Sequence, residues 1–430
     1  MQDNDKKYQS SEEEHKSPEE RKLEEKESMP DSESNHPSKE TLSIGIVPAP
    51  ETASDISDKL ASDLSERLRD YVDDNYTWKV EVVVDSFVGA EEDAYETMKH
   101  ARKIALENNW DYTVAITDIP LFKNGEFLVA EVDDNKALAQ ISFPALGIFP
   151  LYRRVRSSTL QLISEMHHGK NEDARDDVQE RINNLPKTKK KVLHNTDSRE
   201  LIKRGPQKKI LPIDRVVTDD DDTPVRYIAR PKINGYFRVG TGMVRANNPL
   251  KVIRTFKSVV AIAFATGAYA LIFPTVWLLA DAYELERAAT LMVVSYFAMT
   301  TWIILAHNLW ETKKEAPDKA PLVRLHNFST LITIGLGVIV YYFVLLICFL
   351  VAVFLFIPPD LLESDTGIGR EADLGYYIYL SWLITSIATV IGAIGAGLED
   401  EETVLKGTYG YRQRKRKEYL QKQNDNEEGK

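Results

Sequence analysis

The chain has 430 residues, a formal net charge of −12 and a single cysteine. The negative charge argues against a nucleic-acid binder, and one cysteine excludes a disulfide framework or a cysteine-based zinc site within the chain. The hydrophobic share of 43% is ordinary, but it averages a very polar part with four long apolar blocks. A chain of this length has room for two or three domains.

Residues 1–40 are rich in acidic and other polar side chains and contain few large apolar ones. Such a segment cannot bury enough apolar surface to offset the entropy of ordering, so we expect a disordered acidic tail. No apolar stretch follows the first charges, and we therefore expect no cleaved signal peptide. The first apolar block would then act as the insertion signal.

Residues 41–170 alternate between strand and helix signals, which predicts an α/β domain. Short apolar runs indicate buried strands, and stretches with helical spacing indicate helices, in chain order at 42–47, 56–72, 78–84, 94–105, 112–116 and 152–166. The turn signal Lys123-Asn124-Gly125-Glu126 joins two further β-prone runs. We expect a mainly parallel sheet with an antiparallel hairpin at its edge.

Residues 171–257 begin with a polar helix, which Pro186 ends, and continue as a basic stretch of poor periodicity. We expect a linker between the soluble domain and the bilayer. The Lys and Arg residues of 187–257 predict contact with anionic lipid headgroups, worth about 1 kcal/mol for each charge close to the surface. The alternative is a solvated tether.

Four apolar blocks follow that contain no Asp, Glu, Lys or Arg, at 258–280, 288–310, 328–357 and 374–398. Each exceeds the roughly 20 residues with which a helix crosses a ~30 Å hydrocarbon core, so they predict a four-helix transmembrane domain. Pro274 is expected to kink the first span. No charged residue lies at membrane depth, and His307 sits near the end of span two, which disfavours a transporter.

The distribution of Lys and Arg predicts the orientation of the spans. Basic residues gather before span one, between spans two and three, and in the tail 399–430, whereas the other two loops carry only Arg287 and Arg370 among several acids. The soluble domain and both termini are therefore expected in the cytoplasm.

Small residues recur every fourth position along span four, at Thr385, Thr389, Ala393 and Gly397. A ridge of small side chains lets another helix approach closely. We expect this ridge to pack within the chain rather than to form a dimer.

The candidate ligand site lies at the carboxyl ends of the predicted strands, where open parallel sheets bind ligands near helix N-termini. These ends carry Pro48 to Thr52, Asp85, and Thr117 with Asp118. Two carboxylates converging beside a helix N-terminus could hold a divalent cation or a phosphorylated ligand. Because Asp after a strand is also an ordinary turn former, a purely structural role is the alternative.

The chain contains none of the common catalytic motifs. His167 and His168 are adjacent and diverge on a helix, and no His-Glu-x-x-His pair is present. The Gly240-x-Gly242 pair lacks a third glycine and is expected to be a flexible turn. No phosphate-binding loop ending in Lys-Ser/Thr and no Gly-x-Ser-x-Gly elbow occurs.

Eight short motifs are spread over both halves of the chain, at 44–51, 117–121, 142–147, 242–249, 277–281, 306–311, 395–400 and 409–414. Together they resemble an uncharacterised family of Gram-positive bacterial membrane proteins, over about residues 42–417. The resemblance implies a bacterial cell membrane location and carries no assigned activity. Members are sometimes labelled methylenetetrahydrofolate dehydrogenases, but this chain has no dinucleotide fingerprint. Its start also resembles archaemetzincin-type metalloproteases without their zinc motif.

The sequence therefore predicts an integral membrane protein whose cytoplasmic α/β domain binds a small molecule or a protein partner. The four helices would serve as anchor and assembly platform. The alternative is a membrane-surface enzyme that uses Asp85 and Asp118, and a transporter is less favoured.

Overall fold

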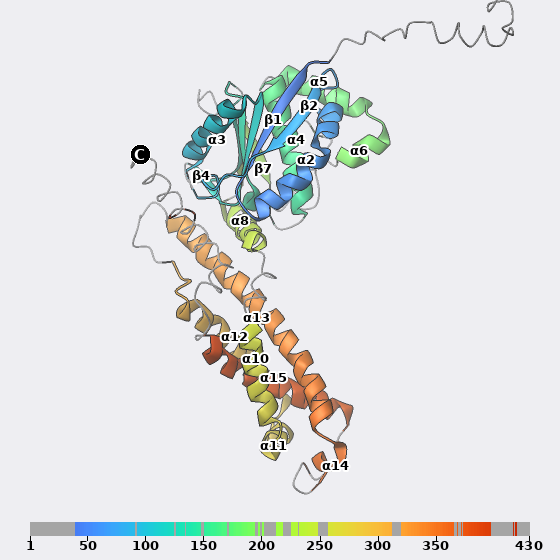
Figure 1. Cartoon of the computed structure of the whole chain (residues 1–430), viewed down its shortest axis with the longest axis vertical. Coiled ribbons are helices and arrows are strands. Elements are labelled where there is room, and N and C mark those ends of the chain that lie inside the picture. Colours follow the sequence, from blue (N-terminus) through green and yellow to red (C-terminus); the bar gives the residue numbers. More distant parts are fainter. Residues whose placement is uncertain are drawn as a thin grey trace, which may run out of the picture. The chain divides into compact units, whose positions relative to one another are not determined.

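In a computed structural model of the chain, the structure describes residues 39–90, 93–123, 126–133, 135–147, 150–169, 172–193, 197, 200–201, 212–217, 225–230, 232–247, 257–311, 320–364, 368, 371, 373–396, 416 and 418. Residues Thr41–Lys430 form one unit by their contacts. Nearly all of the expected acidic tail lies outside the described residues, as do Gly397 and most of 399–430. Figure 1 shows the helices and strands.

The N-terminal half contains a mixed sheet with the strand order β2-β1-β3-β6-β5-β8-β7, and β4 pairs with β5. The strands are β1 (Thr41–Pro48), β2 (Thr77–Val82), β3 (Tyr112–Thr117), β4 (Leu121–Lys123), β5 (Glu126–Asp133), β6 (Leu138–Ser142), β7 (Ile213–Val217) and β8 (Val225–Ala229). Pairing is parallel from β2 to β6 and antiparallel from β6 to β7. The predicted α/β class is confirmed, and the sheet is parallel in one half only.

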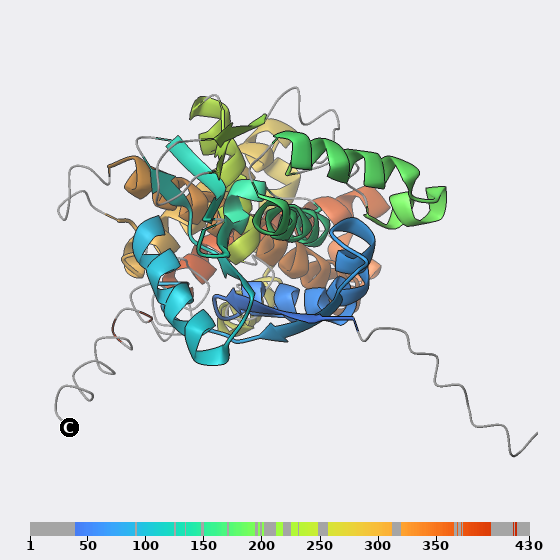
Figure 2. The same cartoon turned by 90° about the horizontal axis from the view of Figure 1, so that it is seen from above.

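Helices cover both faces of the sheet, as Figures 1 and 2 show. The helices of this part are α2 (Thr52–Tyr71), α3 (Ala94–Asn108), α4 (Leu151–His168), α5 (Glu172–Asn184), α6 (Lys187–Leu193) and α8 (Lys232–Asn247), with a short 3-10 helix η1 (Phe143–Leu146). Successive residues of β1 point to opposite faces. Ile46 packs in the core beneath α2 and α4, and Val47 packs with Met98 and Ala101 of α3. This two-sided burial explains the continuous apolar runs of the central strands.

Two strands come from the segment expected to be a linker. All five residues of β8 are buried, and β8 pairs with β5 on the outer side. The predicted hairpin, β4 with β5, therefore lies inside the sheet, and β7 with β8 forms the antiparallel edge. The folded domain thus extends past residue 170. The short strand was hidden from sequence analysis because an acidic run and basic residues flank it.

Several basic residues of this segment contact buried acids of the domain. Nη2 of Arg215 lies 3.1 Å from Oε2 of the fully buried Glu165. Nε of Arg226 lies 3.8 Å from Oε2 of Glu131. These charges neutralise carboxylates inside the fold. Arg215 and Arg226 therefore have partners inside the domain.

The C-terminal half contains helices that are long and apolar enough to cross a membrane. The helices of this half are α10 (Lys257–Ala270), α11 (Pro274–Ala282), α12 (Leu285–Ala306), α13 (Ala320–Phe356), α14 (Pro359–Leu362) and α15 (Leu374–Ala396). Three of them qualify alone, over Leu285–Ala306, Leu322–Phe356 and Leu374–Ile394. The pair α10 and α11 is bent by 90° and adds a fourth candidate if the two form one span.

The bend lies at Pro274, the residue expected to kink the first span. Pro274 begins α11. At this corner Trp277 Nε1 donates to the carbonyl oxygen of Leu271 at 2.9 Å, and the Tyr376 hydroxyl of α15 donates to the carbonyl oxygen of Trp277 at 2.6 Å. These bonds satisfy carbonyl groups near the break and attach the corner to α15.

The small residues of α15 face other helices of the same chain. Thr385 and Thr389 are fully buried, and Ala393 is nearly so. A Cβ added at the neighbouring Gly392 would overlap the Tyr341 hydroxyl of α13 and lie 3.1 Å from Ala263 of α10. The described part of the ridge thus allows close packing inside the bundle.

Candidate functional site at the carboxyl ends of the strands

Asp118, directly after β3, forms a two-point ion pair with Arg416 of the C-terminal tail. Nη1 of Arg416 donates to Oδ1 of Asp118 at 2.8 Å, and Nη2 donates to Oδ2 at 3.2 Å. The Asp118 side chain is 2% exposed and that of Arg416 is 10% exposed. Parallel bonds of this kind between a guanidinium and a carboxylate are stronger and more directional than single ones.

Two backbone carbonyl groups also contact the guanidinium. Nη1 of Arg416 also donates to the carbonyl oxygen of Gly89 at 2.8 Å, and Nη2 donates to that of Pro50 at 3.3 Å. We call the Asp118 carboxylate and the Pro50 and Gly89 carbonyl oxygens the acceptor site. It is built from the segments that follow β1, β2 and β3, which are neighbours in the sheet.

The loops of the acceptor site are fixed to the strands by backbone hydrogen bonds. Ala49 N donates to the carbonyl oxygen of Ile116 at 2.9 Å, and Asp85 N donates to that of Pro48 at 3.0 Å. A Cβ added at Gly89 would overlap Nη1 of Arg416. The site is therefore held by the sheet, and Gly89 leaves room for a planar cation.

Asp85 does not contact Arg416 but shapes the loop that carries Gly89. Its Oδ1 accepts the N–H groups of Phe87 at 2.9 Å and Val88 at 3.2 Å, and Oδ2 lies 3.2 Å from Nε2 of His100. Burial disfavours ionisation of Asp85, but the contacts with His100 and the two N–H groups outweigh it and lower the pKa of this carboxyl. Asp85 thus has the role of a turn former with a charge partner.

The remaining predicted residues are near the strand ends and have backbone partners. Pro48 ends β1 and Thr52 begins α2, where the Thr52 hydroxyl donates to the carbonyl oxygen of Ala246 at 3.4 Å. The buried Thr117 accepts the Ile119 N–H on Oγ1 at 3.1 Å. These contacts position the loops rather than present free groups to a ligand.

The arrangement is unlike a metal centre. Among the described residues, no group of three or more His, Cys, Asp or Glu side chains could hold a metal ion. Asp85 and Asp118 each have a partner of their own, His100 and Arg416. The acceptor site instead offers oxygen atoms to a hydrogen-bond donor that carries positive charge.

Helix α8 packs against this end of the domain, and its glycines lie within the helix rather than in the flexible turn that we expected. A Cβ added at Gly242 would overlap the carbonyl oxygen of Pro144 in η1, and one at Gly240 would lie 2.9 Å from the Phe328 ring of α13. The two glycines permit close approach on two sides. Helix α8 therefore contacts both the end of the sheet and an apolar helix.

The two adjacent histidines lie at the end of α4, and they do not diverge as we expected, because their rings are in edge contact with centroids 4.7 Å apart. Nε2 of His167 lies 3.3 Å from Oδ2 of Asp73, and its Nδ1 lies 3.0 Å from the Tyr112 hydroxyl. Nε2 of His168 lies 3.2 Å from the carbonyl oxygen of Val72. Burial, reinforced by the neighbouring His167, lowers the pKa of His168 to about 4. Because Tyr112 begins β3 and Asp118 follows it, these histidines lie at the other end of the strands.

Sequence reasoning missed Arg416. It stands in the basic run Arg412 to Lys417, where nothing local distinguishes it from its neighbours. Its contacts depend on tertiary structure alone.

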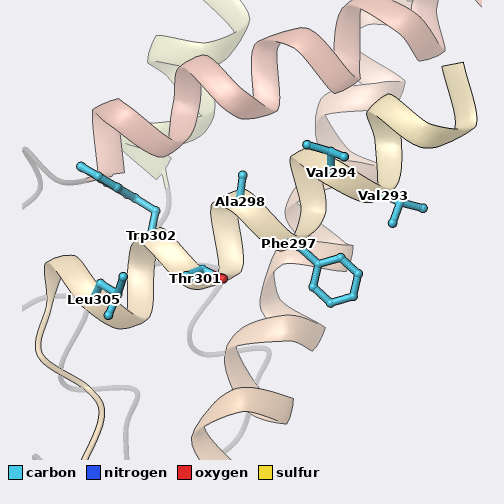
Figure 3. A pocket seen from close by; sticks show the side chains of 7 residues that line it. All are labelled: Val293, Val294, Phe297, Ala298, Thr301, Trp302 and Leu305. Carbon is cyan, nitrogen blue, oxygen red and sulfur yellow. The ribbon is translucent and has the colours of Figure 1, made fainter. Parts of the chain in front are cut away.

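A hollow of about 460 Å³ lies along α12. Figure 3 shows that all seven lining side chains come from this one helix: Val293, Val294, Phe297, Ala298, Thr301, Trp302 and Leu305. Among the lining side chains Thr301 brings a hydroxyl group and Trp302 an indole N–H, and the other five are apolar, so the hollow lacks the converging polar groups of a specific ligand site. An apolar outer face is what a lipid-facing helix requires.

The comparisons with known proteins add no family to this picture. The chain matches no protein-family model, no curated protein and no solved structure.

Proposed function

We propose that the chain is a multi-pass membrane protein whose α/β domain and C-terminal tail lie in the cytoplasm. The domain binds a small molecule or a protein partner at the carboxyl ends of β1, β2 and β3. The apolar helices act as anchor and assembly platform. The family resemblance of the sequence motifs supports a bacterial cell membrane.

The ion pair between Arg416 and Asp118 supports the topology. Asp118 precedes α10 and Arg416 follows α15, so their contact requires an even number of membrane crossings between them. Three helices qualify as spans alone, and the even number is reached when α10 and α11 together form one crossing. The basic flanks of the spans favour the cytoplasmic side for both partners.

The acceptor site is the observation that supports binding. Open α/β sheets bind ligands beyond the carboxyl ends of their strands, and here three adjacent ends present oxygen atoms to a charged group. Asp118 is paired with Arg416 and Asp85 contacts His100 and two backbone N–H groups, which favours binding over catalysis. Helix α8 contacts both η1 and α13. A ligand at this edge of the sheet therefore lies close to the helix that joins the α/β domain to the apolar helices.

The test is thermal unfolding of the full-length chain in lipid nanodiscs with four probes: Mg²⁺, inorganic phosphate, a mononucleotide and a set of short peptides. We expect at least one probe to raise the melting temperature of the parent chain. Asp118→Asn should abolish that shift, and Asp55→Asn, which removes an exposed carboxylate of α2, should keep it. A panel without effect, or equal shifts in all three proteins, would contradict binding at this edge.

A further inference from the structure

We propose that the acceptor site recognises the guanidinium group of arginine, and that Arg416 occupies it in place of an arginine from another molecule. The inference rests on the proposed binding function and names the chemical class of the ligand. Release of the tail would open the site to an arginine side chain of a partner peptide or to free arginine.

The hydrogen-bond pattern selects a guanidinium group. The two Nη nitrogens carry four N–H bonds, and four acceptor contacts are present: Asp118 Oδ1 and Oδ2, Gly89 O and Pro50 O. A lysine ammonium is a compact charge with three donors and cannot match this planar fork. A neutral urea group of the same shape lacks the charge that compensates the buried carboxylate.

The acceptors belong to the sheet and not to the tail. The Pro50 and Gly89 carbonyl groups lie in loops that are hydrogen-bonded to β1 and β3, and Asp85 holds the Gly89 loop through two N–H groups. Arg416, in contrast, is 298 residues from Asp118 in sequence. A site whose geometry is fixed without its occupant can accept the same group from another molecule, because little ordering cost remains.

The tethered Arg416 competes with any external guanidinium. An intramolecular group has an effective concentration on the order of millimolar, so its removal should strengthen external binding at least about tenfold. The experiment uses the full-length chain in nanodiscs and measures binding of N-acetyl-L-argininamide by calorimetry. The variants are Arg416→Gln, Arg414→Gln as the charge-matched control, and the double variant Arg416→Gln with Asp118→Asn.

We expect Arg416→Gln to bind this probe at least about tenfold more tightly than the parent and Arg414→Gln do. The double variant should lose binding, and Arg416→Gln should bind the lysine and citrulline analogues at least about tenfold more weakly. Equal affinity of Arg416→Gln and Arg414→Gln, or equal binding of the lysine analogue, would overturn the proposal. Free L-arginine is the second arm: tighter binding of the capped probe indicates a peptide ligand, and tighter binding of free arginine a small-molecule ligand.

A second measurement leaves Arg416 in place, in case its removal prevents folding. A spin label at Glu418→Cys, in a Cys348→Ala background, reports the mobility of the tail. We expect N-acetyl-L-argininamide to raise this mobility and the lysine analogue to leave it unchanged. A label that responds to neither compound, or equally to both, would contradict the exchange of Arg416 for the added guanidinium.

The outcomes separate this inference from the proposed function. If a probe without a guanidinium group stabilises the parent in an Asp118-dependent way, the proposed function stands and this inference fails.

Discussion

Arg416 donates from both Nη atoms to both carboxylate oxygens of Asp118, although the two residues are 298 positions apart. Every helix of the C-terminal half lies between them in the chain. The pair therefore links the α/β domain to the segment that follows the apolar helices in the chain. If these helices cross a bilayer, the pair requires an even number of crossings.

Removal of one partner of this pair should destabilise the protein more than removal of both. Arg416→Gln leaves a nearly buried carboxylate, and Asp118→Asn leaves a guanidinium without its counter-ion, at a cost of about 1–3 kcal/mol each. In the double variant the two losses should not add. Melting temperatures of the four proteins in nanodiscs measure the coupling, and strict additivity would show that the pair does not form.

The topology can be measured in cells with reporters. A reporter fused after Lys430 should be cytoplasmic, and one inserted near Asp365 should be external, because four crossings place the loop between α13 and α15 outside. Three crossings would separate the tail from the domain by the bilayer. Labelling of the 358–373 loop only after the membrane has been permeabilised would contradict this arrangement.

The α/β domain should require β8 and β7 to fold. A fragment of residues 39–247 should be monomeric and unfold cooperatively, whereas 39–170 should aggregate. The shorter fragment exposes the edge of β5 that β8 covers, and it leaves the buried Glu165 without Arg215 and Tyr227. Loss of a partner from a buried charge costs about 3–5 kcal/mol. Size-exclusion chromatography measures the oligomeric state of the two fragments, and thermal unfolding measures their stability. A short fragment that is monomeric and as stable as the long one would refute the prediction.

The stability of the chain should fall between pH 6.5 and pH 4 through His168. The pKa of His168 is about 4 in the folded chain, compared with the ordinary histidine value of 6.5 that applies to the unfolded chain. Within that window the unfolded state binds more protons, so stability is complete above pH 6.5 and decreases as the pH falls. Because His168 is partly exposed, we expect about 1–2 kcal/mol after solvent screening. His168→Gln should reduce the slope of melting temperature against pH, and an unchanged slope would exclude this histidine as the cause.

The sequence determined the local elements. Strands β1, β2 and β3 and helices α2, α3 and α4 follow their predicted segments, since apolar periodicity depends on near neighbours in the chain. The apolar blocks likewise predicted the long helices, and Pro274 predicted the bend between α10 and α11. The same reasoning located the segments after β1, β2 and β3 as the candidate site, because the order of elements fixes where parallel strands end.

Only the tertiary structure decided what these loops hold and how far the sheet extends. Five residues of β8 are too few for a clear pattern, and their place beside β5 depends on burial by distant segments. Arg416 has no local feature that separates it from five neighbouring basic or polar residues, and its partner is 298 positions away. Pairing over such distances is set by the assembled fold, in which Asp118 is buried and requires a counter-charge.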